Sequence, residues 1–228
     1  MLLAFDTSSA AVTVALSTPT GAVVASSSSV DALRHGELLA PAIAAALSEA
    51  GCGPRDLTRI AVGTGPGPFT GLRVGLVTGR TMAEVLGIPL VGVCSLDVIA
   101  RASTVDGPVA VATDARRKEI YWALYDAPAA DGGRRRLEGP AVDKPADVAH
   151  VLAGLPVIGR GATLYSTALQ LPEAPAASAA SAASGDEYPS AETLARGVAD
   201  GTLSTGPADP LYLRRPDVTM STGPKSVL

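Results

Sequence analysis

The sequence predicts a mixed α/β fold in two lobes, on the strength of its hydrophobic patterns and of a repeated unit. Short segments in which apolar and polar residues alternate are typical of strands, and longer segments with an apolar stripe at helical spacing lie among them. The first strand ends in Asp6, and a second strand follows after a turn. The same order returns in the second half of the chain, around Asp114. A repeated strand–aspartate–turn–strand unit indicates two halves of related topology.

The first lobe is assigned to residues 1–103. Its expected elements are strands at 2–6, 11–16 and 22–26, a helix that ends at Gly51, a strand at 60–63, a helix at about 70–86, a strand at 89–93 and a helix at 95–102. The first helix is recognised by an apolar stripe formed by Leu38, Leu39, Ala42, Ile43, Ala46 and Leu47. The stripe stops where Gly51 and Pro54 provide a strong stop signal. Ser95 is expected to cap the last helix of the lobe.

The second lobe is assigned to residues 104–228. Its expected elements are strands at 108–114 and 119–125, a hairpin tip at 131–136, a helix at 190–199 and an extended segment at 210–214. We expect an Ala/Ser-rich run at 173–188 to be flexible and the tail at 216–228 to be disordered. Duplicated halves of this kind are typical of the actin-like (ASKHA, RNase H-like) fold, which actin, sugar kinases and Hsp70 share.

Composition and charge exclude several classes of protein. The chain has 228 residues and a formal net charge of −4, so it lacks the basic surface that holds nucleic-acid phosphates unaided. A partner must therefore hold any RNA substrate. No stretch is apolar over the length of a membrane span, and the first residues do not resemble a signal peptide, so we expect a cytoplasmic protein with no membrane partner. Two distant cysteines, Cys52 and Cys94, indicate neither a disulfide framework nor a zinc site.

The strongest local signal is a glycine- and proline-rich segment, residues 63–75, that leads directly into a helix. Free backbone N–H groups at a helix start favour an anion. The segment lacks the Gly-Lys-Ser/Thr ending of a P-loop, and its two prolines, Pro66 and Pro68, remove donors that a phosphate would need. On turn chemistry alone, a rigid structural turn is favoured over a phosphate site.

The helix after this turn carries Gly71, Gly75 and Gly79 at four-residue spacing. Each interior glycine costs about 1 kcal/mol of helix stability relative to alanine, so three in register require a packing reason. The stripe either packs on the protein's own sheet or receives a helix of a partner chain. The first helix is also rich in small residues on its outer side, at Ala40, Ala44 and Ala45, which favours a helical interface shared by both helices.

A nucleotide site of the actin-like class is expected to begin where the first strand ends, at Asp6, Thr7 and Ser8, and to continue at Asp114 in the second half. Working versions of such a site normally have glycine just after the aspartate, so that the backbone can approach the phosphates. Neither aspartate is followed by glycine in this chain. We therefore expect nucleotide binding to be weak or to be completed by another subunit.

Metal and hydrolase chemistry find little support in the sequence. His35 and His150 are the only histidines and do not form a His-x-x-x-His pair, so we predict no metal site. A Ser-His-Asp hydrolase can be composed from separate residues, but the Gly-x-Ser-x-Gly elbow is absent, and we keep this alternative only as a third hypothesis.

With these residues in place, the chain resembles the TsaB family, also called YeaZ, of bacterial tRNA modification proteins. The segments that carry the resemblance are residues 3–8, the run from His35 to Pro41, the glycine motif at 65–75, Asp114-Ala115-Arg116 and Tyr212-Leu213-Arg214. They span almost the whole chain, and the glycine motif is the most specific of them. The histidine pair and nucleotide site that TsaD-like relatives carry are lacking here.

The resemblance implies a non-catalytic scaffold that pairs with a TsaD-type catalytic subunit, joined by a TsaE-type ATPase. The pair transfers a threonylcarbamoyl group to adenosine beside the anticodon of tRNAs, and tRNA reaches this chain only through the complex. No cofactor is expected to be tightly bound, with ATP or ADP at most at a subunit interface. Without TsaD, the two N-terminal helices are expected to form a homodimer. The residues assigned to partner binding are His35, Leu38, Leu39, Gly71, Leu72, Val74, Gly75, Thr78, Gly79 and Met82.

One alternative from another functional class stays open. Asp6 and Asp114 are also what an independent ATPase or small-molecule kinase of the actin-like class would require. Tight binding of ATP and magnesium by the isolated chain would favour this alternative over the scaffold.

Overall fold

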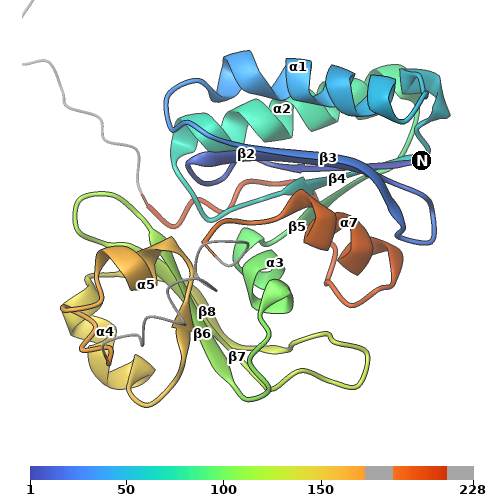
Figure 1. Cartoon of the computed structure of the whole chain (residues 1–228). Coiled ribbons are helices and arrows are strands. Elements are labelled where there is room, and N and C mark those ends of the chain that lie inside the picture. Colours follow the sequence, from blue (N-terminus) through green and yellow to red (C-terminus); the bar gives the residue numbers. More distant parts are fainter. Residues whose placement is uncertain (173–186, 215–228) are drawn as a thin grey trace, which may run out of the picture.

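Two β-sheets organise the chain into two lobes (Figure 1). The computed structural model describes residues 1–172 and 187–214. Most of the run expected to be flexible (173–188) and the whole tail expected to be disordered (216–228) therefore lie outside the described residues. The first sheet has five strands in the order β3-β2-β1-β4-β5, and the second has four in the order β8-β7-β6-β9.

The first sheet combines an antiparallel meander with two parallel strands. Its strands are β1 (Leu2–Asp6), β2 (Ala11–Ser17), β3 (Val23–Val30), β4 (Arg59–Gly63) and β5 (Leu90–Val93). β1 pairs antiparallel with β2 and parallel with β4, which places it at the centre of the sheet. All five residues of β1 are buried, because helices cover both faces of the sheet.

Helices α1 (His35–Glu49) and α2 (Phe69–Leu86) cover one face of this sheet, and α3 (Ser95–Ala102) and α7 (Ala191–Ala199) lie on the other (Figure 1). Side chains of β1 alternate between the two faces. Leu3 and Phe5 join the core under α1 and α2, whereas Leu2 and Ala4 join the core that contains α7. The assignment of all of residues 104–228 to the second lobe is therefore wrong for α7, which packs on the first sheet.

The second sheet repeats the opening of the first. Its strands are β6 (Val109–Asp114), β7 (Ile120–Tyr125), β8 (Arg136–Asp143) and β9 (Val157–Ile158), accompanied by helices α4 (Pro145–Leu152) and α5 (Arg160–Leu164), and a short 3-10 helix, η1 (Pro54–Asp56), precedes β4. β6 pairs antiparallel with β7 and parallel with β9, as β1 pairs with β2 and β4. The predicted duplication, and with it the actin-like fold, is confirmed.

Several predicted boundaries differ from the structure. β3 runs to Val30 instead of residue 26, since its serine-rich second half forms an exposed edge that polar side chains tolerate. α1 already begins at His35, one turn ahead of the apolar stripe that identified it. None of the helices within residues 1–172 and 187–214 has the length and apolar character that crossing a bilayer requires.

Candidate functional site

Asp6, the first residue predicted to bind a nucleotide, is an internal brace. Its carboxylate is 1% exposed and accepts hydrogen bonds from the Ser8 amide (2.7 Å), the Ser8 hydroxyl (2.7 Å) and the Ser95 hydroxyl (2.5 Å). A Cβ at Gly63 would lie 1.7 Å from its Oδ2. Burial raises the pKa of this carboxyl above its usual 3.8, against the lowering effect of the bonds from Ser95 and Ser8. The prediction that Asp6 faces a nucleotide is therefore wrong: the carboxylate ties β1 to the start of α3.

Thr7, the second predicted nucleotide ligand, also points inward. Its hydroxyl donates to the carbonyl of Gly71 (2.8 Å) and accepts from the amide of Gly75 (3.0 Å). These are the two groups that an undistorted helix would pair with each other. A buried hydroxyl that satisfies both of them anchors α2 to the turn after β1, so Thr7 has a structural role.

The glycine stripe of α2 faces the protein's own sheet. A Cβ at Gly71 would lie 2.5 Å from the Thr7 carbonyl oxygen, and one at Gly75 would lie 2.5 Å from the Thr7 hydroxyl. At Gly79 the nearest atoms are side-chain carbons of Leu90 (3.2 Å) and Phe5 (3.4 Å). The groove is thus already filled, and the interpretation of these three glycines as a surface for a partner helix is wrong.

The rigid turn predicted before this helix also packs against the turn after β1. A Cβ at Gly67 would lie 1.9 Å from the carbonyl oxygen of Ser8, so the backbones of the two turns are in direct contact. Glycine is required here for close approach of the two chains. The preference for a structural turn over a phosphate site agrees with this packing.

The other predicted partner residues divide into two groups. Leu39 and Leu72 are 1% exposed and His35 is 7% exposed, and the His35 ring Nε2 lies 2.7 Å from the Ser9 carbonyl oxygen. These three belong to the interior, so the prediction is wrong for them as well. The remaining four, Leu38, Val74, Thr78 and Met82, are half-buried and stay available at the margin of the two helices.

The outer sides of α1 and α2 present an apolar surface, which we call the helical face. It is formed by Ala40, Ala44 and Ala45 of α1 and by Phe69, Arg73, Val77 and Val85 of α2. Val77 is 55% exposed and Val85 is 79% exposed. At one end the Phe69 ring lies 5.1 Å from the ring of Tyr212 and 5.0 Å from the Arg73 guanidinium. Exposed apolar groups gathered on one face are typical of protein–protein interfaces.

A cleft of about 210 Å³ lies between the lobes. Its lining includes Ser8, Asp114, Arg116, Arg160 and Glu187. Of the four predicted nucleotide ligands, the structure thus brings together Ser8 and Asp114 and leaves out Asp6 and Thr7.

The charged side chains of this cleft are engaged with one another. Asp114 Oδ1 accepts the Arg116 amide (2.9 Å) and the Tyr165 hydroxyl (3.2 Å), and Arg160 forms an ion pair with Glu187 at 3.0 Å. Within residues 1–172 and 187–214, no three His, Cys, Asp or Glu side chains gather as metal ligands. The arrangement offers neither an open carboxylate for magnesium nor a glycine-rich backbone for phosphates.

Sequence reasoning missed Arg160 and Glu187, and it could not place the ring of Tyr212. The signal near Arg160 was its pair of glycines, which is too short for an adenosine site. A Cβ at Gly161 would lie 2.8 Å from the backbone carbonyl carbon of Ala112, so this glycine permits α5 to approach β6. Close backbone approach explains it without a ligand.

Comparison with known proteins identifies the family. A family model described as "TsaD: tRNA N6-adenosine threonylcarbamoyltransferase" matches residues 18–205. A solved structure from Pseudomonas aeruginosa, described as similar to peptidase YeaZ, is 31% identical with a TM-score of 0.74, over 93% of this chain and 99% of that one. The chain belongs to the TsaB (YeaZ) family.

Two further relatives of this TsaB-family chain differ in coverage. An uncharacterised protein of Mycobacterium leprae is 41% identical over 224 residues, which are 95% of this chain but only 55% of that protein. The Bacillus subtilis tRNA threonylcarbamoyladenosine biosynthesis protein TsaB is 37% identical over 92 residues, or 40% of each chain. The chain thus spans about half the length of the M. leprae relative.

Proposed function

We propose that this chain is a non-catalytic subunit of the cytoplasmic machinery that makes threonylcarbamoyladenosine on tRNA. The name of the B. subtilis relative supports the pathway. The observation that carries the non-catalytic role is the state of Asp6. Three donors occupy its carboxylate, and Gly63 closes the space beyond it, so the residue best placed to hold a nucleotide-bound metal in this fold has no free oxygen to offer.

The helical face is the surface that we propose for the TsaD-type catalytic subunit. Val77 and Val85 are large, exposed and apolar, and Phe69 with Arg73 adds the residue types that are enriched at interface hot spots. A second copy of this chain occupies the face when the TsaD-type subunit is absent. A TsaE-type ATPase joins the pair, and tRNA enters through the complex, which agrees with a net charge of −4.

Co-purification with the TsaD-type subunit of the same organism tests this proposal. A charge placed at the centre of the face, Val77→Glu, leaves an unpaired carboxylate in a desolvated interface, so co-elution on a sizing column should be lost. Val24→Glu on β3 is the matched control, since Val24 is also exposed (41%) and lies on a different element. Retention of the complex by Val77→Glu, or its loss in Val24→Glu, would contradict the proposed surface.

An independent ATPase or kinase is the second candidate, because Ser8 and Asp114 line one cleft. The cleft volume of about 210 Å³ is small against the roughly 300–1,000 Å³ of typical ligand sites. Calorimetric titration with ATP and magnesium separates the candidates. We expect no tight binding by the isolated chain, and any ATP or ADP to bind only at a subunit interface of the assembled complex.

A further inference from the structure

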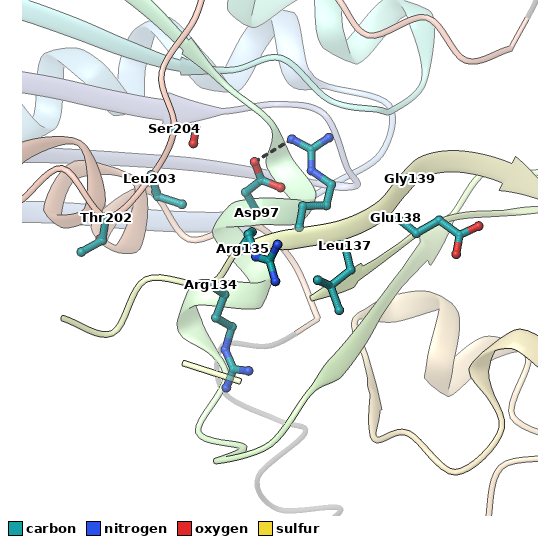
Figure 2. A pocket seen from close by; sticks show the side chains of 10 residues that line it. Asp97, Arg134, Arg135, Leu137, Glu138, Gly139, Thr202, Leu203 and Ser204 are labelled. Atoms are coloured by element: carbon teal, nitrogen blue, oxygen red, sulfur yellow. Dashed lines mark hydrogen bonds and ion pairs between the residues drawn. The ribbon is translucent and has the colours of Figure 1, made fainter. Parts of the chain in front are cut away.

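The outer edge of β8 borders a groove that the proposed function does not use. β8 is the edge strand of the second sheet, so its side away from β7 has no strand partner within that sheet. A cavity of about 380 Å³ runs along residues 134–139. Figure 2 shows Thr202, Leu203 and Ser204 on one side of this cavity, Leu137, Glu138 and Gly139 on the other, and Asp97 between them.

The backbone of this edge is available for pairing. The Arg135 carbonyl accepts the amide of Asp126 (2.9 Å), which directs the polar backbone groups of Arg135 toward β7. In an antiparallel ladder the next residue turns its N–H and C=O to the opposite side, so Arg136 directs them outward. Within the described chain, no backbone hydrogen bond joins β8 to residues 202–204. The groove therefore separates an unpaired strand edge from an opposing wall.

Features that protect edge strands lie at one end of this groove. Pro140 has no N–H, and the pairing with β7 is irregular where Gly139 approaches the Trp122 carbonyl, with a Cβ position only 2.7 Å from that oxygen. Prolines and bulges are common means of blocking strand addition. Residues 136–138, which precede both features, remain open, and Leu137 is 51% exposed.

The charge of the lining favours an acidic occupant. Three arginines, at 134–136, face two carboxylates, and one of these, Asp97, is already paired with Arg136 at 3.0 Å. The other, Glu138, extends away from Asp97 in Figure 2. Arg135 is 77% exposed and holds only a surface ion pair with Asp126, so it can turn to a ligand at little cost. Among the described residues, the buried Nε of Arg136 has no hydrogen-bond partner.

We propose that the edge of β8 at residues 136–138 is a docking site for an extended acidic segment of another protein. The segment adds a fifth strand to the second sheet through main-chain hydrogen bonds and places a carboxylate against Arg135 and Arg136. This site lies in the lobe opposite the helical face, so its occupant and the TsaD-type subunit can bind at the same time. The proposal stands or falls independently of the proposed function.

Selection of random linear peptides displayed on phage, against the whole chain, tests this proposal. We expect the enriched peptides to be acidic and to bind at least about tenfold more weakly to Arg135→Glu. Arg34→Glu is the matched control, because Arg34 is also exposed and pairs with a nearby aspartate, Asp31, at 2.8 Å. Failure to enrich acidic peptides, or equal weakening by both variants, would overturn the proposal.

Synthetic copies of a selected peptide provide a second measurement that leaves the protein unchanged. In an added strand, only every second amide faces β8. N-methylation of that alternate set should weaken binding about tenfold or more, while N-methylation of the other set should leave it nearly unchanged. Equal effects of the two sets would show that the peptide does not pair as a strand, and the proposal would be abandoned.

Discussion

Substitution of Gly75 by alanine distinguishes an internal glycine stripe from an open groove by the sign of its effect. In an open groove, alanine would stabilise α2 by about 1 kcal/mol, because glycine is the poorer helix former. In the structure, the new Cβ would lie 2.5 Å from the Thr7 hydroxyl oxygen. Overpacking of this kind costs about 1–3 kcal/mol. Displacement of the hydroxyl would also break its two hydrogen bonds, at about 1 kcal/mol each.

The sum predicts that Gly75→Ala lowers the free energy of unfolding by about 2–4 kcal/mol after the propensity gain is subtracted. The same substitution in a Thr7→Ala background should have the opposite sign. Without the hydroxyl, the nearest atoms to the new methyl group are the Cβ of residue 7 and Val62 Cγ2, both at 3.6 Å, which is ordinary contact. There the alanine should stabilise the chain by up to about 1 kcal/mol.

Urea denaturation of the four chains in this cycle measures both effects. Gly36→Ala on α1 is the control for propensity alone, because nothing lies within 4 Å of the Cβ position at Gly36. If Gly75→Ala stabilised the wild-type chain as Gly36→Ala does, the stripe would have free space, and the internal packing of α2 on Thr7 would be refuted.

Two further predictions concern buried ionisable groups. Because burial raises the pKa of Asp6 in the folded chain above its usual 3.8, its contribution to stability should be present below that pH and be lost as the pH rises through the folded value. The free energy of unfolding of the wild type minus that of Asp6→Asn should therefore fall as the pH increases above about 4, and a rise would contradict the assignment. Burial also raises the pKa of the Cys94 thiol to about 12, so iodoacetamide should label Cys52 well before Cys94 in the native chain, as mass spectrometry can establish; equal rates would be inconsistent with this burial.

The local parts of the fold were accessible from the sequence. β1 and α3 occupy the predicted residues, since alternation and a serine next to the helix start are properties of neighbouring residues. β9 has only two residues and carries no usable pattern. β8 mixes exposed residues with Gly139 and Pro140, which hides its alternation. The packing of α7 on the first sheet is a contact between distant parts of the chain, which no local signal encodes.

The candidate site shows the same limit more sharply. A four-residue glycine spacing states that something approaches α2 closely, but the sequence alone does not say whether it is Thr7 of the same chain or a helix of another. Likewise, an aspartate at the end of a strand can face a cleft or turn inward, and only the positions of Ser8 and Ser95 decide for Asp6. Of the predicted ligands, Ser8 and Asp114 reached the cleft because they lie on turns that face the opposite lobe.

Reconstituted tRNA modification, with purified TsaD-type and TsaE-type subunits, tests the scaffold role most directly. The rate of threonylcarbamoyladenosine formation would be compared for the wild-type chain, Asp114→Asn in the cleft and Val77→Glu on the helical face. A scaffold predicts that Asp114→Asn supports the wild-type rate and that Val77→Glu does not. The reverse pattern, an inactive Asp114→Asn that still forms the complex together with an active Val77→Glu, would show that the chain contributes chemistry of its own.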